Sequence, residues 1–314
     1  MNQPTSTTPR RRLRRGSAIA ASFATVLALA GCSSSSKSDE SKDTTATTAA
    51  SADSGGAPID NALTITTPDM EYDVSGSLRP GVGAITMDNT DDVTHMLAFA
   101  QVKDGVTTDQ VTAALDKSEE EAGKLFVDSG PEGPAPLGTP ALVGPGQRST
   151  VTALDLKPGT YAMICFLTDD QGEPHWKMGM VKEVEISGDT ATEKPESDGT
   201  ITLNDDAITM PDDFNGSGTF LVTNTGKNPH AFSVAKLDAG TSLATFAGAV
   251  GQTEQAGKSI DVDGGVLAGG VDALLPGQSA YLTLDLEPGH YGYISPEDMN
   301  SPELPPQHGE FDVG

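Results

Sequence analysis

The run Leu154-Asp155-Leu156-Lys157-Pro158-Gly159-Thr160-Tyr161 returns later in the chain as Leu284-Asp285-Leu286-Glu287-Pro288-Gly289-His290-Tyr291. Each run alternates apolar and polar residues and then stops at a Pro-Gly pair, which is typical of a β-strand that ends in a turn. A Pro-Gly-Gln turn precedes both runs, beginning at Pro145 and at Pro276. The two runs therefore indicate an internal duplication of a β-rich unit.

Landmarks further from these runs extend the duplication. Asn89-Thr90 precedes His95 by the same interval that separates Asn224-Thr225 from His230. An Ala-Phe pair follows each histidine, at Ala98-Phe99 and at Ala231-Phe232. Because the landmarks occur in the same order in both halves, we expect two copies of one folding plan.

The fold class predicted from this pattern is all-β. Short alternating runs such as Thr150–Leu154 and Tyr281–Leu284, bounded by Pro-Gly turns, favour Greek-key sandwiches. Each copy also contains a helical excursion between strands. In the first copy Thr107-Thr108-Asp109 can cap a helix that leads to Leu125-Phe126, and in the second the segment 241–255 has weaker helical character.

The N-terminus has the pattern of an export signal. A block of five arginines between Arg10 and Arg15 is followed by an apolar run, Ala18 to Ala30, and by Leu29-Ala30-Gly31-Cys32. This ending resembles the lipobox of bacterial lipoproteins, in which the cysteine is acylated and becomes the new N-terminus. The resemblance implies lipidation of Cys32 and a location outside the cytoplasm, anchored to a membrane by lipid.

Composition and spacing divide the rest of the chain. We expect a signal peptide at 1–31, a disordered Ser/Thr/Ala tether at 32–58, a first domain at 59–188, a linker at 189–199 and a second domain at 200–314. Without the signal peptide, 14 basic residues face 45 acidic ones, a net charge near −31. A surface this acidic repels nucleic acid, so nucleic-acid partners are excluded.

Four residues of the first copy carry metal-ligand chemistry: His95, Cys165, His175 and Met180. Once Cys32 carries lipid, Cys165 is the remaining cysteine of the chain, so an intrachain disulfide is excluded. Two imidazoles, a thiolate and a weak axial thioether are the ligands of a mononuclear type 1 copper site. The set therefore makes copper the predicted cofactor.

These residues resemble the cupredoxins, the plastocyanin-like blue copper proteins. The resemblance rests on Asn89 with His95, on the strand Pro158 to Cys165, and on His175-Trp176-Lys177-Met178-Gly179-Met180-Val181. It implies two tandem cupredoxin-like sandwiches and one copper ion for electron transfer, with a redox protein as the partner. In this pattern His95, Cys165 and His175 are the main ligands and Met180 is the axial ligand. It also implies that His175 lies near an exposed edge, where the electron leaves.

One departure and two alternatives stand beside this reading. Nine residues separate Cys165 from His175, more than compact blue copper proteins have. His95 and Cys165 also fit a metal-free core, which would make the chain a binding or structural module of the cell envelope. The third reading is a Cu(I) carrier that uses soft methionine ligands. Its candidates are Met96, Met163, Met178 and Met180.

The second copy lacks the complete ligand set. His230 matches His95, but Ser295 stands where Cys165 stands, and Gly309-Glu310-Phe311 is expected where Gly179-Met180-Val181 falls. We expect no copper there. The chain also lacks hydrolase and phosphate-loop motifs, and it has five histidines without His-x-His pairs. On these grounds we expect that the chain is not an enzyme and not a multicopper oxidase.

Overall fold

The computed structural model describes residues 58–127, 129–130, 133–296 and 307–314. The predicted signal peptide, Cys32 and all of the predicted tether except Pro58 lie outside these residues. Within the described part, none of the helices combines the length and apolar character that crossing a membrane requires.

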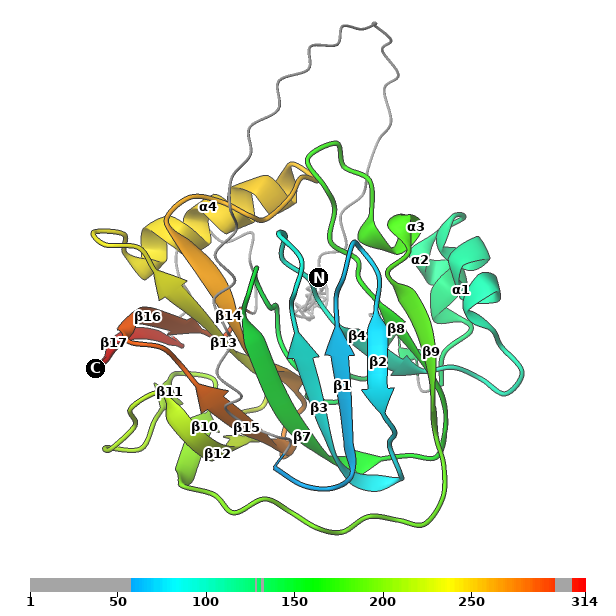
Figure 1. The fold of residues 1–314 in the computed structure, drawn as a ribbon, viewed down its shortest axis with the longest axis horizontal. Helices are drawn as coiled ribbons and strands as arrows, with labels where there is room; N and C mark the ends of the chain where they lie inside the picture. The colour runs from blue at the N-terminus through cyan, green and yellow to red at the C-terminus, as the bar shows by residue number, and fades with distance from the viewer. Residues whose placement is uncertain (1–57, 128, 131–132, 297–306) are drawn as a thin grey trace, which may run out of the picture.

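The first half is a sandwich of two sheets (Figure 1). One sheet has the strand order β2-β1-β3-β7, in which β1 and β3 are parallel, and the other has the order β4-β8-β9. The strands are β1 (Ala62–Thr66), β2 (Asp73–Gly76), β3 (Gly81–Asp88), β4 (Ala98–Gln101), β7 (Arg148–Leu156), β8 (Gly159–Ile164) and β9 (Val181–Ile186).

The second half repeats this plan. One sheet has the order β11-β10-β12-β15, again with a parallel pair, β10 and β12, and the other has the order β14-β13-β16-β17. The strands are β10 (Gly199–Leu203), β11 (Ile208–Thr209), β12 (Ser217–Asn224), β13 (His230–Leu237), β14 (Gly265–Leu274), β15 (Ser279–Asp285), β16 (Gly289–Ile294) and β17 (His308–Val313). The predicted all-β class with tandem sandwiches is thus confirmed.

The two halves share one continuous sheet. Strand β7 pairs antiparallel with β15, so that Val151 lies opposite Leu282 and both side chains are fully buried. The joined sheet has eight strands in the order β11-β10-β12-β15-β7-β3-β1-β2, in which the second half mirrors the first. The two halves are therefore joined by a shared sheet as well as by the linker.

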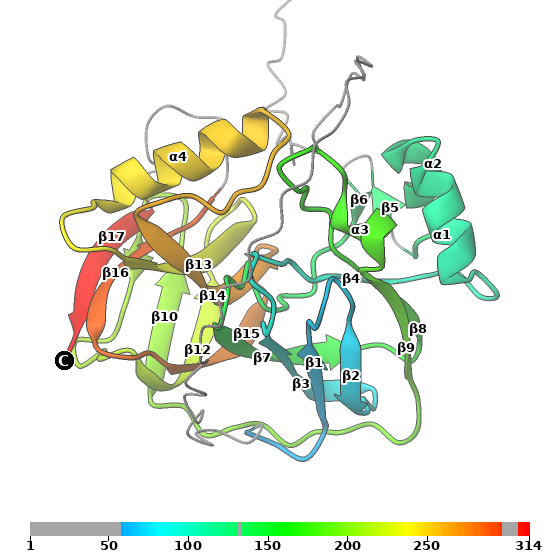
Figure 2. The same ribbon diagram turned by 45° about the horizontal axis from the view of Figure 1, so that its top comes forward.

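Helices occupy the connections between strands, as predicted. α1 (Thr108–Leu115) begins at Thr107, whose hydroxyl accepts from the Gln110 amide in a capping box, and α2 (Glu119–Gly123) follows it. α4 (Leu243–Gln255) begins at Ser242. In Figures 1 and 2 it lies at the end of the second half nearest to the short helix α3 (His175–Met178). A small hairpin, β5 (Ser129–Gly130) and β6 (Gly133–Pro134), completes the first half.

The duplicated motifs have matching structural roles. The hydroxyl of Tyr161 donates to the Lys157 carbonyl at 3.1 Å, and that of Tyr291 donates to the Glu287 carbonyl at 2.8 Å. Each tyrosine thus ties the start of its strand to the preceding Pro-Gly turn, an arrangement known as a tyrosine corner.

The repeated asparagines are buried ties between loops. The Asn89 amide donates to the carbonyls of Val93 and Val143, each at 2.8 Å. Asn224 makes the corresponding bonds to Asn228 and Leu274. Because buried amides need such partners, Asn89 and Asn224 fix the chain just before His95 and His230, the two corresponding histidines of the repeat.

The predicted linker is attached to the first half along part of its length. The Ala191 amide donates to the Pro80 carbonyl at 2.8 Å, and the Ala191 carbonyl accepts from Val82 at 2.9 Å. Ala191 is buried. The domain boundaries at 188 and 200 remain predictions, since the shared sheet crosses from one half to the other.

Candidate metal centre

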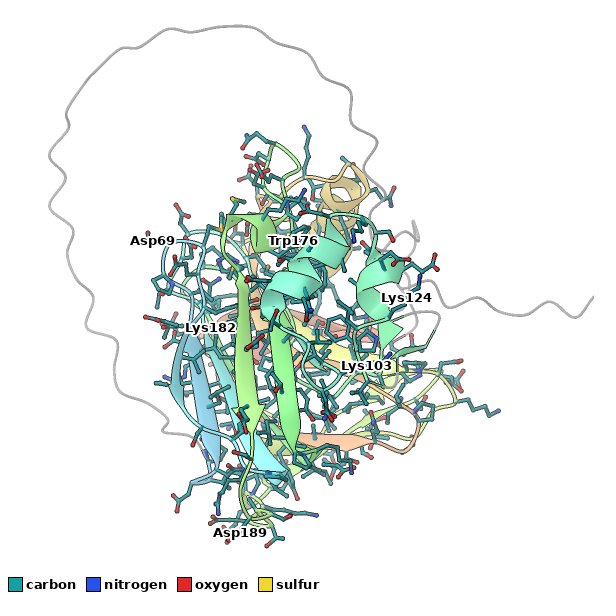
Figure 3. The ribbon with its side chains drawn as sticks, turned by 90° about the vertical axis from the view of Figure 1, so that its right-hand side faces the viewer. Asp69, Lys103, Lys124, Trp176, Lys182 and Asp189 are labelled. Carbon is teal, nitrogen blue, oxygen red and sulfur yellow. The ribbon has the colours of Figure 1, made fainter. Side chains whose placement is uncertain are left out.

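The four candidate ligands of the first half come from two connections, the one that leads into β4 and the return from β8 to β9. His95 precedes β4 and pairs through its backbone with Val143, at 3.0 and 2.9 Å. Cys165 directly follows β8, and its amide donates to the carbonyl of Met180, the residue before β9. His175 opens α3. Figure 3 shows Trp176, the next residue, at one end of the first half, with Asp189 at the opposite end.

Three of the four side chains meet at one point. Sγ of Cys165 lies 3.5 Å from Nδ1 of His175 and 3.9 Å from Nδ1 of His95. The two Nδ1 atoms are 3.3 Å apart. All three residues are buried. Their ligand atoms lie close enough together to share one metal ion.

The size of this triangle fits a bound ion. Three ligands that share one ion at about 2.0–2.3 Å in a trigonal plane lie roughly 3.5–3.8 Å apart. The observed sides of 3.3, 3.5 and 3.9 Å match that arrangement. A thiolate with two imidazoles is a donor set that suits copper.

Asp91 fixes the orientation of the first imidazole. Its carboxylate oxygen Oδ2 lies 3.2 Å from Nε2 of His95 and accepts the Met70 amide at 2.9 Å. A proton on Nε2 that donates to Asp91 leaves the lone pair of Nδ1 directed at Cys165 and His175. The metal-binding tautomer of His95 is thereby favoured before any ion arrives.

The thiol of Cys165 is stabilised in its neutral form. Complete burial raises its pKa to about 12, and hydrogen bonds to its sulfur from the Met96 and Leu167 amides and from the Tyr72 hydroxyl lower it in part. Tyr72 is itself buried and donates to the Met96 carbonyl at 2.5 Å. A metal ion that binds this sulfur has to displace the proton, so metal binding at Cys165 releases a proton and depends on pH.

Both imidazoles are also held neutral. Burial lowers the pKa of His175 to about 4, helped by the neighbouring His95 and opposed by Asp169, Asp261 and Asp91. Burial likewise lowers the pKa of His95, against the hydrogen bond to Asp91. Neutral imidazoles are the form that binds metal, so the two side chains need no deprotonation at neutral pH.

The nine-residue segment between Cys165 and His175 closes on itself. The Asp169 carboxylate accepts the amides of Gln171 and Glu173, each at 2.8 Å, and the His175 amide donates to the Leu167 carbonyl at 2.8 Å. These bonds fold the segment into a tight loop. The added length therefore does not separate the ligands.

The methionines divide into two groups. Met180 and Met163 are fully buried in the same core cluster as Cys165 and Tyr72, and the Met180 amide donates to the His175 carbonyl. Met178 is exposed and Met96 is half-buried. Met180 is thus the methionine tied by its backbone to both Cys165 and His175.

The expected exposure of His175 is wrong. Only 2% of this residue is accessible to solvent. Leu167, in the loop that leads to His175, packs against both the first-half core and a cluster of the second half that contains Phe246 and Ile260. This loop therefore contacts the second half.

The second half carries an altered version of this centre. The Ser295 hydroxyl lies 3.5 Å from Nδ1 of His230, and Asp205 lies 3.1 Å from Nε2. The Ser295 amide donates to the Gln307 carbonyl, as the Cys165 amide does to that of Met180. Gln307, not the expected Gly309-Glu310-Phe311, therefore occupies the methionine position, because this loop is shorter. Without a thiolate the set does not match a type 1 site.

No protein-family model matches the chain, and no curated protein matches it. Similar solved structures include auracyanin from Roseiflexus castenholzii, with 18% identity, a TM-score of 0.28 and coverage of 41% of this chain and 98% of that one. Auracyanin A from Chloroflexus aurantiacus, described as a blue copper protein, has 17% identity, a TM-score of 0.27 and coverage of 40% and 98%. A multicopper oxidase has 13% identity, a TM-score of 0.22 and coverage of 81% and 88%.

The two sandwiches and the buried His–Cys–His cluster match the arrangement that the resemblance to cupredoxins implies, so that resemblance is confirmed for the fold. The low scores leave the chemistry of the chain to be argued from the cluster itself. The expectation that the chain is not an enzyme is wrong on this comparison, because the similar structures include an oxidase. That expectation was based on the absence of hydrolase and phosphate-loop motifs and of His-x-His pairs, and it is withdrawn.

Proposed function

We propose that the chain binds one copper ion in its first half and transfers single electrons. His95, Cys165 and His175 would hold the ion, with Met180 as the weaker fourth ligand. The observation that carries this proposal is the buried triangle of one sulfur and two nitrogen atoms, with sides of 3.3 to 3.9 Å. When bound, copper in such a set supplies a one-electron redox couple.

The residues around the triangle support this use. Asp91 holds the His95 ring and the amides of Met96 and Leu167 hold the sulfur, so the donors keep one geometry without an ion. Burial also keeps water from the ligand atoms. Ligands held rigidly by surrounding hydrogen bonds move little when the charge at the centre changes, which favours rapid electron transfer.

The experiment uses the full chain loaded with Cu(II) and records its visible spectrum and copper content. We expect one copper per chain and an intense band at about 600 nm from the thiolate of a type 1 site. The band should vanish in Cys165→Ala and persist in Ser295→Ala, which alters the corresponding position of the second half. A colourless protein that takes up Cu(I) would support the carrier reading instead. A protein that binds neither ion would support the metal-free envelope module.

We also propose that the protein is exported and anchored to the outer face of a membrane through lipid on Cys32, where it meets a redox protein partner. The support is the sequence pattern of Arg10 to Cys32 and the polar segment that follows it. Mass spectrometry of the N-terminal peptide and detergent-phase partition test this proposal. We expect an acylated Cys32, and we expect Cys32→Ser to move the protein into the aqueous phase.

A further inference from the structure

The residue before the first ligand is bonded to the second half. The Thr94 amide lies 3.1 and 3.0 Å from the two carboxylate oxygens of Asp261, and the Thr94 hydroxyl donates to one of them at 2.5 Å. Thr94 is buried and directly precedes His95. These three contacts join positions that are 167 residues apart.

Asp261 is held in place by its own neighbours. The Ser259 hydroxyl donates to Oδ2 of Asp261 at 2.9 Å and accepts the Asp261 amide at 3.2 Å. Ile260, between them, is buried in the cluster that contains Phe246 of α4. The Ser259 hydroxyl and the buried Ile260 side chain therefore hold the segment that carries the Asp261 carboxylate.

The other ligand segment touches the same region. Leu167 lies in the loop between Cys165 and His175, and its carbonyl accepts the His175 amide at 2.8 Å. Its side chain packs against the cluster of Ile260 and Phe246. A Cβ atom on Gly172, near the tip of this loop, would lie 3.0 Å from the Gly257 carbonyl oxygen. The backbones approach closely there, just beyond α4 (Figures 1 and 2).

We propose that Asp261 is a positioning residue for the metal centre, and that the segment Ser259–Asp261 of the second half completes the centre by fixing the His95 and His175 segments. This inference rests on the proposed copper function. It gives the second half a task that does not require a metal of its own. Charge-assisted bonds from a backbone amide and a hydroxyl to a carboxylate are among the stronger hydrogen bonds in proteins, so the contact can hold the backbone beside His95.

The test compares variants of the full chain. Asp261→Ala removes the acceptor, Asp261→Asn keeps a carbonyl oxygen while removing the charge, and Thr94→Val removes the hydroxyl alone. The matched control is Asp263→Ala, because Asp263 is exposed, lies two residues further on and takes no part in the bonds to Thr94. Two readouts are used: hydrogen exchange of the Thr94 amide without metal, and copper affinity with the visible spectrum.

Without metal, we expect the Thr94 amide to exchange at least about tenfold faster in Asp261→Ala than in the wild type or in Asp263→Ala. With copper, we expect Asp261→Ala to weaken affinity about 10-fold or more and to shift the visible band, as loss of a residue that orients a ligand does. Asp261→Asn should keep the band near its wild-type position, and Thr94→Val should lie between the two.

Each failure has its own signature. If Thr94 exchanges equally fast in Asp261→Ala and Asp263→Ala, the positioning role is overturned whatever the metal does. Where the wild type binds copper, the same conclusion follows if those two variants match in copper affinity and spectrum. If the wild type binds no copper but Thr94 is protected only when Asp261 is present, the proposed copper function fails while the contact between the halves stands. Should Asp261→Ala not fold, Thr94→Val decides by copper affinity and spectrum, and values equal to those of Asp263→Ala would overturn the positioning role.

Discussion

Individual carboxylates orient the histidines of both halves, but they come from different places in the chain. Asp91, four residues before His95, accepts from its ring, whereas Asp205, in a separate turn, takes that role for His230. The histidines and Cys165 could be predicted because residue type and order are legible in the sequence. Asp205 could not be predicted, because its contact depends on how two distant loops pack.

Tyr72 is the residue whose substitution tests the environment of the thiolate. Its hydroxyl donates to the Met96 carbonyl at 2.5 Å and is within hydrogen-bonding reach of the Cys165 sulfur. In Tyr72→Phe the Met96 carbonyl loses this donor, so we expect the metal-free protein to lose about 1 kcal/mol of unfolding free energy. With copper, Cys165 is a thiolate to which the Tyr72 hydroxyl can turn its proton, and we expect its loss to lower the reduction potential, because a hydrogen bond to the sulfur favours the reduced ion.

Chemical denaturation and voltammetry measure these two effects. Tyr161→Phe is the matched control, since Tyr161 is equally buried but donates to the Lys157 carbonyl in the tyrosine corner. We expect this control to lose stability and to keep the wild-type potential. Equal potentials in Tyr72→Phe and Tyr161→Phe would refute a role for Tyr72 at the sulfur.

Among the elements, the strands could be predicted better than the connections between them. The Leu-Asp-Leu run and its Pro-Gly turn have one local structure in each half because the tyrosine corner repeats. The return from β16 to β17 could not be aligned from sequence, since it is shorter than the return from β8 to β9. Only the pairing of Ser295 with Gln307 reveals which residue replaces Met180.

A histidine clamp across β16 and β17 gives a prediction for pH. His290 lies 2.8 Å from Asp312 and 3.2 Å from Glu310. The hydrogen bond to Asp312, and to a smaller extent that to Glu310, raises the pKa of His290. A histidine whose folded pKa is raised stabilises the protein fully below its unfolded value of about 6.5 and loses this effect as pH rises through the folded value. We therefore expect His290→Gln to be less stable than the wild type at about pH 5.5 and equal to it at about pH 9.

NMR titration of His290 checks the cause directly. We expect its pKa to fall toward the ordinary value in Asp312→Asn, which removes the nearer carboxylate. Asp312 is preferable to Glu310 for this purpose, because Glu310 also accepts the Leu243 amide at 2.7 Å and so supports the start of α4. A His290 pKa that is unchanged in Asp312→Asn would assign the shift to another group.

For the whole molecule, the duplicated sequence predicts two sandwiches but not the sheet that unites them. An alternating pattern identifies which face of a strand is buried, yet it does not say which strand lies beside its edge. Val151 and Leu282 look like ordinary core residues in the sequence, and in the structure they meet where β7 joins β15. The contact of Thr94 with Asp261 is equally invisible in sequence, since it spans 167 residues.

The shared sheet predicts that both halves unfold together. Trp176, the single tryptophan, lies in the first half and reports its unfolding by fluorescence, while circular dichroism reports both halves. Leu203 is fully buried in the core of the second half, so Leu203→Ala should cost about 2–4 kcal/mol. If the β7–β15 pairing and the Thr94–Asp261 contact couple the halves, this change lowers the denaturation midpoint of the Trp176 signal as much as that of the dichroism signal. A Trp176 midpoint that stays at the wild-type value, with a second transition in the dichroism, would mean that the halves unfold independently despite their common sheet.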